Sequence, residues 1–126
     1  MTVKILVVEP GKKPYEKEIE NNLSSFQKEV EGRIEPIYPF EDDSVFCYCN
    51  EESKMNGSKL NWGWFIDDRL VDAVCGTFIV LGDNGNGGER SLTENEIEMA
   101  KRFFTKNRFV EHKDSFVLVE NAYFFE

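Results

Sequence analysis

Residues 3–11 read Val-Lys-Ile-Leu-Val-Val-Glu-Pro-Gly, and this stretch contributes most to the fold prediction. The apolar run Ile5–Val8 is rich in β-branched residues and is followed by a Pro-Gly turn signal, so it predicts a strand buried on both faces. A helix is predicted next, and Gly32 is expected to end it in a left-handed conformation. Four apolar residues at helical spacing would line its buried face: Ile19, Leu23, Phe26 and Val30.

Five further segments have the composition of strands. Ile34–Phe40 and Val45–Cys49 flank an acidic break and predict a hairpin. Val71–Leu81 predicts a strand interrupted by glycine, and Phe116–Val119 with Ala122–Phe125 predicts a last strand or hairpin. Since a helix that connects two strands of one sheet usually makes them parallel, the sheet is expected to be mixed.

The second helix carries an explicit start signal. Thr93 and Glu96 have the spacing of a capping box, and Leu92 with Ile97 has the spacing of a hydrophobic staple. The prediction is therefore an α+β fold that starts β-α-β, with a mixed sheet of about five strands and two main helices. One domain is expected over residues 1–126.

Composition narrows the classes of partner. The chain has 24 acidic and 15 basic residues and a net charge of -9, which disfavours direct binding to nucleic acid or to an anionic membrane. The acidity could serve solubility or could imitate nucleic acid. No apolar run is long enough for a signal peptide or a membrane span. Three cysteines, an odd number, argue against a disulfide framework, so a cytoplasmic location with reduced thiols is expected.

Motifs for metal binding or catalysis are weak. Cys47 and Cys49 could be zinc ligands, but two thiols on one strand face are more typical of a core. The segment Asp83–Glu94 matches a calcium loop only at a few positions, because glycines replace ligands. No metal, no cofactor and no catalytic residues are therefore predicted, although an enzyme with Glu51, Glu52 or Asp67 as a base stays a less favoured alternative.

The connection from Asn50 to Asp72 is the strongest candidate for an interface. It is long and polar, yet it contains Trp62, Trp64 and Phe65 next to Asn61. Because large aromatic residues are enriched at binding hot spots, these four residues are predicted to contact a partner. The competing interpretation is that the indoles form a small core under the connection.

A small-molecule or nucleotide site is the second hypothesis. Its polar groups would come from the turn that holds Glu9 and Lys12 and from the segment that holds Asn50, Glu51 and Asn56. Both segments are expected near strand ends, where sheets of α/β proteins bind ligands.

The chain resembles a family catalogued only as a domain of unknown function, DUF3846. The resemblance lies in residues 3–15, 37–42 and 50–52, and again in residues 76–82 and 91–93. That family is common on bacteriophages and other mobile elements. The chain departs from it at Leu60-Asn61-Trp62, where the family tends to have an arginine in the third place. The resemblance implies a genomic setting, on phages or mobile elements, and implies no particular activity. It favours a non-catalytic acidic binding protein of a phage or mobile element, which interferes with a host defence or regulatory protein.

Overall fold

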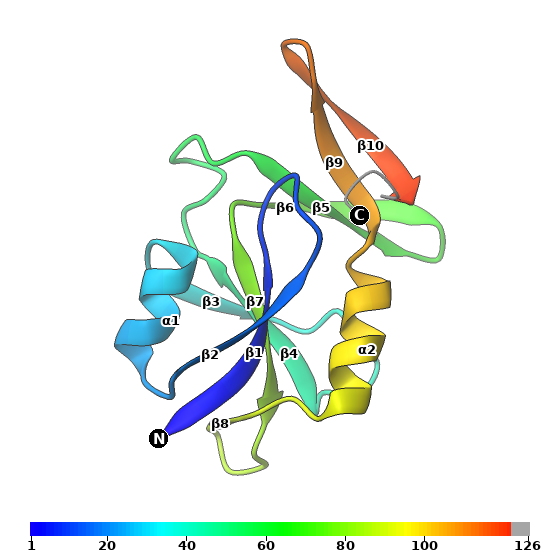
Figure 1. Ribbon diagram of the computed structural model, residues 1–126. Helices are drawn as coiled ribbons and strands as arrows, with labels where there is room; N and C mark the ends of the chain where they lie inside the picture. Colours follow the sequence, from blue (N-terminus) through cyan, green and yellow to red (C-terminus); the bar gives the residue numbers. More distant parts are fainter. Residues whose placement is uncertain (122–126) are drawn as a thin grey trace.

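The computed structural model describes residues 1–121 as two antiparallel sheets with two helices (Figure 1). In chain order the elements are β1 (Thr2–Val8), β2 (Tyr15–Glu20), α1 (Leu23–Val30), β3 (Ile34–Ile37), β4 (Val45–Asn50), β5 (Leu60–Ile66), β6 (Arg69–Cys75), β7 (Phe78–Asp83), β8 (Glu89–Arg90), α2 (Glu94–Phe103), β9 (Lys106–His112) and β10 (Ser115–Asn121). Strands dominate, so the α+β class fits only loosely. Neither helix in this part of the chain is long and apolar enough to cross a membrane.

The first sheet has the order β2-β1-β7-β4-β3, with β8 paired to β7. The predicted buried strand is confirmed, since every residue of Ile5–Val8 is at most 1% exposed. The predicted hairpin is also confirmed, because β3 pairs antiparallel with β4.

The predicted β-α-β start is wrong. Tyr15–Glu20 forms β2, which pairs antiparallel with β1, and the first helix begins only at Leu23. Ile19 still points toward the core, but from a strand whose other residues are exposed and mostly charged. The start is therefore β-β-α, and the sheet is antiparallel and not mixed.

The C-terminus of α1 explains both Gly32 and Asn50. Glu31, not Gly32, has the left-handed conformation, with φ of 62°. The Nδ2 group of Asn50 donates to the carbonyl oxygens of Val30 at 3.0 Å and of Glu31 at 3.2 Å. A Cβ at Gly32 would lie only 2.6 Å from that Nδ2 atom, so the close approach requires glycine.

Each face of the first sheet is covered by one helix (Figure 1). Phe26 and Val30 of α1 pack against Ile5, Ile79 and other residues on one face. The predicted capping box of α2 is confirmed by the bonds between Thr93 and Glu96. This helix packs on the other face through a larger cluster, which includes Ile97, Ala100, Phe104, Phe78 and Trp62.

A second sheet, with the order β10-β9-β5-β6, was not predicted. The segment expected to be an irregular connection contains β5 and the start of β6. Asp67 and Asp68 join them in a tight turn with φ of 50° and 62°, a conformation that aspartate tolerates better than most residues. The turn therefore lacks the glycine that usually marks it in a sequence.

The strand predicted over Val71–Leu81 is two strands in two sheets. Gly76, with φ of 73°, separates β6 of the second sheet from β7 of the first. Phe116–Val119 lies in β10, as predicted, while Ala122–Phe125 lies outside the described residues. The strand β9 was missed entirely.

Candidate functional site

The Trp62 indole is buried and cannot contact a partner. Its side chain is 1% exposed, and its ring centroid lies 4.9 Å from that of Phe104 and 5.6 Å from that of Phe103. Trp64 stacks on Trp62 at 6.1 Å and is partly exposed, as is Phe65. The expectation that Trp62 is accessible is therefore wrong, because its face of β5 packs against the first sheet.

Asn61 is also buried, and it joins the two sheets. Its Nδ2 group donates to the carbonyl oxygen of Val8 at 2.9 Å and of Gly76 at 2.7 Å. Its Oδ1 atom accepts a bond of 2.7 Å from Arg108. With no exposed surface, Asn61 supports the fold and has no atoms available to a partner.

Arg108 was missed by the sequence interpretation, although it is fully buried. Its guanidinium donates to three backbone carbonyl oxygens, those of Glu9 (2.7 Å), Phe104 (3.0 Å) and Asn61 (3.3 Å). Burial lowers the pKa of Arg108 to about 10, so the group is still charged at neutral pH. These hydrogen bonds connect β9 to the end of α2 and to the turn after β1.

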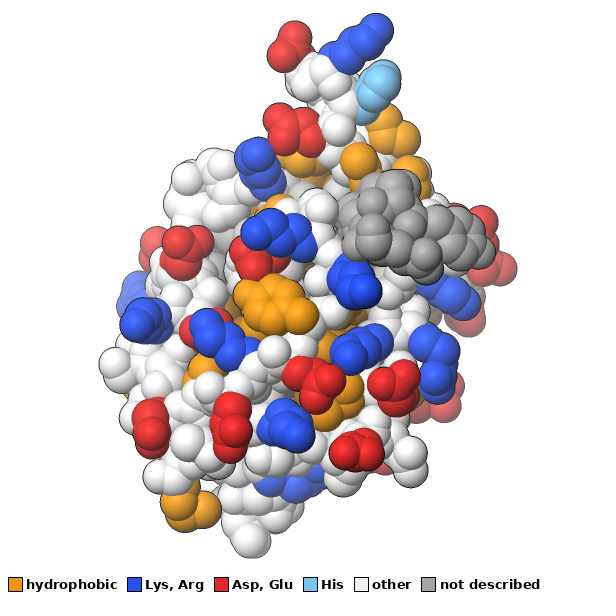
Figure 2. Space-filling model, viewed as in Figure 1, with side chains coloured by type: hydrophobic (Ala, Val, Ile, Leu, Met, Phe, Trp, Pro, Cys, Tyr) orange, Lys and Arg blue, Asp and Glu red, His pale blue; other side chains and the backbone are white. Residues whose placement is uncertain are grey.

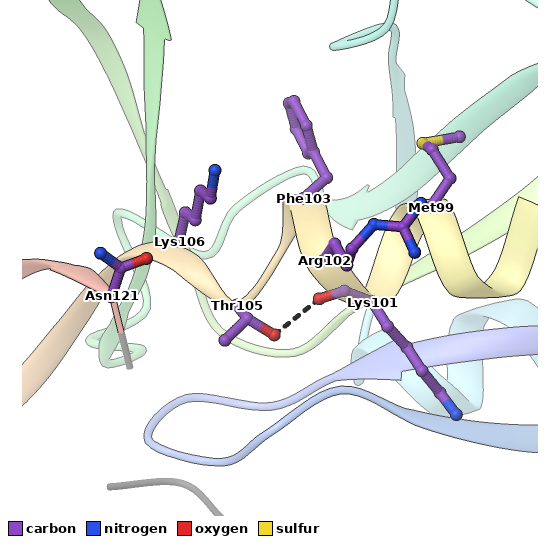
Figure 3. A pocket seen from close by; sticks show the side chains of 7 residues that line it. All are labelled: Met99, Lys101, Arg102, Phe103, Thr105, Lys106 and Asn121. Carbon is purple, nitrogen blue, oxygen red and sulfur yellow. Dashed lines mark hydrogen bonds between the residues drawn. The ribbon is translucent and has the colours of Figure 1, made fainter. Parts of the chain in front are cut away.

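A pocket of about 480 Å³ lies at the C-terminal end of α2, and we call it the α2–β9 pocket. Figure 3 shows Lys106 and Asn121 on one side of it, with Met99 and Arg102 of the helix on the other. Among residues 1–121, the lining consists of Met99, Lys101, Arg102, Phe103, Thr105, Lys106 and Asn121.

Local interactions fix the turn from helix to strand. The Thr105 hydroxyl donates to the carbonyl oxygen of Lys101 at 2.6 Å, and the Phe104 amide donates to that of Ala100 at 2.9 Å. Phe104 is fully buried and anchors this turn. Asn107 then adopts a left-handed conformation with φ of 56°, which is easier for asparagine than for most residues.

The α2–β9 pocket combines positive charge with apolar surface. Lys101 forms an ion pair with Glu16 at 3.2 Å, whereas Arg102 and Lys106 form no ion pair with any residue from 1 to 121. Figure 2 shows blue side chains over α2, interspersed with red ones. Phe103 is 36% exposed, and Met99 is partly buried. Cations near the C-terminus of a helix interact favourably with the helix dipole and so stabilise the helix. Because these cations also lie beside apolar side chains, they suit a ligand that has a carboxylate next to an apolar group.

Comparison with known families places the chain. The profile of the family described as Domain of unknown function (DUF3846) matches residues 1–105. The chain belongs to the DUF3846 family. No curated protein and no solved structure shows significant similarity to it.

The DUF3846 match ends between α2 and β9. The matched part supplies Met99, Arg102 and Phe103 to the pocket, whereas Lys106 and Asn121 come from beyond the match. The α2–β9 pocket is thus formed where the family domain meets the β9–β10 hairpin.

The structure does not gather the predicted ligand residues of this DUF3846 protein into one pocket. Asn50 and Glu51 line a pocket of about 130 Å³ that also contains an ion pair between Lys54 and Asp72. Asn56 instead accepts a bond of 3.1 Å from the Ser58 amide, which stabilises a turn.

The three thiols lie in the core or at its edge. Cys47 and Cys49 are buried in the cluster under α2, as predicted for strand residues on one face. Burial raises the pKa of Cys49 to about 12, so this thiol is protonated at neutral pH. Within residues 1–121, no three His, Cys, Asp or Glu residues lie close enough to hold a metal ion.

Glu9 and Lys12 lie in the turn between β1 and β2. The Tyr15 hydroxyl donates to a carboxylate oxygen of Glu9 at 2.6 Å, and Lys12 lies 3.7 Å from that carboxylate. Burial, and then the bond to Glu9, raise the pKa of Tyr15 to about 12. The carboxylate therefore holds this hairpin in shape.

This bond leads to a pH prediction. In Glu9→Gln the negative charge is lost while the burial remains, so the pKa of Tyr15 should fall part of the way from about 12 toward 10.0. Because the folded-state pKa is raised, the associated stability is complete below pH 10 and decreases as the pH rises toward 12. Ultraviolet absorbance of the phenolate, compared with Tyr15→Phe, measures the shift. An unchanged titration curve in Glu9→Gln would refute the assignment.

Proposed function

We propose that this DUF3846 protein is a non-catalytic binding protein, and that its α2–β9 pocket takes a segment of another protein with carboxylates beside apolar side chains. The observation that carries the proposal is the charge distribution. Lys101, Arg102 and Lys106 line the same pocket as the apolar side chains of Met99 and Phe103, in a chain whose net charge is -9. Arg102 and Lys106 have no ion pair within residues 1–121, so no described carboxylate competes with a ligand for them.

The size and composition of the pocket support a specific contact. A volume of about 480 Å³ lies within the range typical of binding pockets. Arginine and aromatic side chains are the residues that most often carry binding energy, and Arg102 and Phe103 are adjacent here. A nucleic acid is a poorer candidate, because the net charge of -9 repels a dense row of phosphates more strongly than a few carboxylates.

The non-catalytic part of the proposal is supported by the roles of the polar and thiol side chains, which pack in the core or bond to the backbone. Cys49 has a pKa of about 12, and the side chains of Asn50 and Asn61 are bonded to backbone carbonyls. The family resemblance predicts a wider role, that of a phage protein that interferes with a host defence or regulatory protein. This role stays a prediction, and the α2–β9 pocket would be the surface that contacts the host protein.

The test uses a synthetic peptide in which glutamate and phenylalanine alternate. We expect Arg102→Glu/Lys106→Glu to weaken its binding by roughly tenfold to a hundredfold, because two attractive contacts become repulsive. Isothermal titration calorimetry at low and at physiological salt measures the change. Thermal melts of both proteins check that the variant is folded.

The matched control is Lys12→Glu/Lys13→Glu, which changes the net charge equally in the turn after β1. It should leave the affinity nearly unchanged. A second control replaces glutamate by lysine in the peptide, and this peptide should bind much more weakly. The proposal is refuted if the pocket variant binds as well as the unmodified chain, or if both double variants lose affinity equally, since that would indicate a general effect of charge.

A further inference from the structure

The edges of the first sheet are protected against pairing with another strand. The outer strand β2 carries exposed charges along its length, including Glu16, Lys17 and Glu18. On the opposite side, β3 has only four residues and contains Pro36. Charges, proline and short length are the usual means by which proteins block edge pairing.

One edge of the second sheet is protected in a different way. The pairing of β6 with β5 shifts register between the Trp64–Asp72 and Phe65–Leu70 pairs, so Val71 has no direct partner. Such a bulge twists an edge and disrupts its regular array of backbone groups. Lys54 also forms an ion pair with Asp72 on this strand.

The other edge, β10, has no proline and no bulge, and its one charged residue is Glu120. Its central residues Phe116–Val119 contain no charge, proline or glycine, and they pair with β9 without a register shift. Val117 is 45% exposed. Within residues 1–121, no strand pairs with the outer side of β10. Figure 1 shows the β9–β10 hairpin extending beyond the body of the molecule, so another strand can approach it.

We infer that β10 pairs antiparallel with β10 of a second copy of the chain, and that the second sheets of the two copies form one continuous sheet. An edge strand with an uncharged apolar centre and no proline or bulge is a surface on which another strand adds backbone hydrogen bonds. This dimer is independent of the ligand proposed for the α2–β9 pocket.

A second copy fits because β10 is complementary to itself. A two-fold axis through Leu118 places Val117 opposite Val119 and Phe116 opposite Glu120, so no like charges face each other. The neighbouring symmetric register, centred on Val117, would place Asp114 opposite Glu120. Two chains of net charge -9 repel each other, but the residues at the centre of β10 carry no charge, so they add no repulsion at the contact.

Sedimentation equilibrium from low to high micromolar concentration tests the dimer. We expect the unmodified chain to dimerise and Val117→Lys to be monomeric over the same range, because an edge lysine blocks pairing. The matched control is Val71→Lys on β6, a valine that is 53% exposed, and it should still dimerise. A monomeric unmodified chain would overturn the inference, and so would a dimer that survives in Val117→Lys.

The register has its own test. With the axis through Leu118, the two Leu118 Cα atoms face each other at about 4.5–5.5 Å, a separation that a disulfide can span. Leu118→Cys should therefore form a covalent dimer with oxidised glutathione, whereas Val71→Cys should not. If Val71→Cys cross-links as readily as Leu118→Cys, β10 is not the interface.

Discussion

Arg108→Ala is expected to lower the free energy of unfolding by about 3–5 kcal/mol, as for other breaks in buried charged networks. The substitution leaves the carbonyl oxygens of Glu9, Phe104 and Asn61 without this donor in a buried site. Each buried polar group left unpaired costs about 1–3 kcal/mol, and the removal of a buried charge offsets part of the loss. Urea denaturation followed by circular dichroism measures the difference.

One variant separates the bonding of Arg108 from its charge, and a second serves as a control at an exposed arginine. Arg108→Lys keeps the charge but not the planar fork, so it should lose most of the same stability. Arg69→Ala removes an exposed arginine from β6 and should change the free energy of unfolding by less than about 0.5 kcal/mol. Equal stability of Arg108→Ala and the unmodified chain would show that Arg108 does not hold the two sheets together.

Trp62→Ala is expected to cost about 3–5 kcal/mol, the range for a large aromatic residue removed from a core. Its ring contacts Phe78 of the first sheet, Phe103 of α2 and Phe104 directly after α2. Trp64→Ala should cost clearly less, because Trp64 is partly exposed. Thermal melts of the two variants give the comparison directly.

Trp62→Phe provides a finer control. The Nε1–H group of Trp62 has no acceptor within residues 1–121, so this substitution removes an unpaired donor and keeps an aromatic ring. It should therefore be much milder than Trp62→Ala. A Trp62→Ala protein with an unchanged melting temperature would instead revive the hypothesis that the indole serves a partner.

The features that the sequence predicted correctly depend on neighbouring residues. The start of α2 follows from Thr93 and Glu96, which bond to each other within one helical turn. The β3–β4 hairpin follows from two apolar runs with an acidic break between them. Local signals of this kind need no knowledge of the rest of the fold.

The errors occurred where distant contacts decide the structure. Ile19 and Leu23 have helical spacing, yet hydrogen bonding to β1 places Ile19 in β2. The same holds for the Trp62 segment, whose composition suits either a surface or a core. Only the pairing of β5 with β6 and β9 determines that Trp62 faces inward.

The candidate site could be predicted only in part. Lys101, Arg102 and Phe103 are adjacent in the sequence and lie on a helix that was predicted correctly. Their pocket, however, depends on Lys106 and Asn121, and Asn121 lies at the end of a hairpin whose first strand was not predicted. Arg108 gave no local signal either, because its partners come from β5, the end of α2 and the turn after β1.

The α2–β9 pocket can be tested most directly through its methionine. The chain has three methionines, and Met1 and Met55 are 99% and 91% exposed and lie outside the pocket lining, so their methyl groups serve as internal controls. In protein labelled with ¹³C at the methionine methyl groups, addition of the glutamate–phenylalanine peptide should shift the Met99 resonance and leave the other two in place. A Met99 signal that stays fixed while the peptide binds would contradict the proposed site.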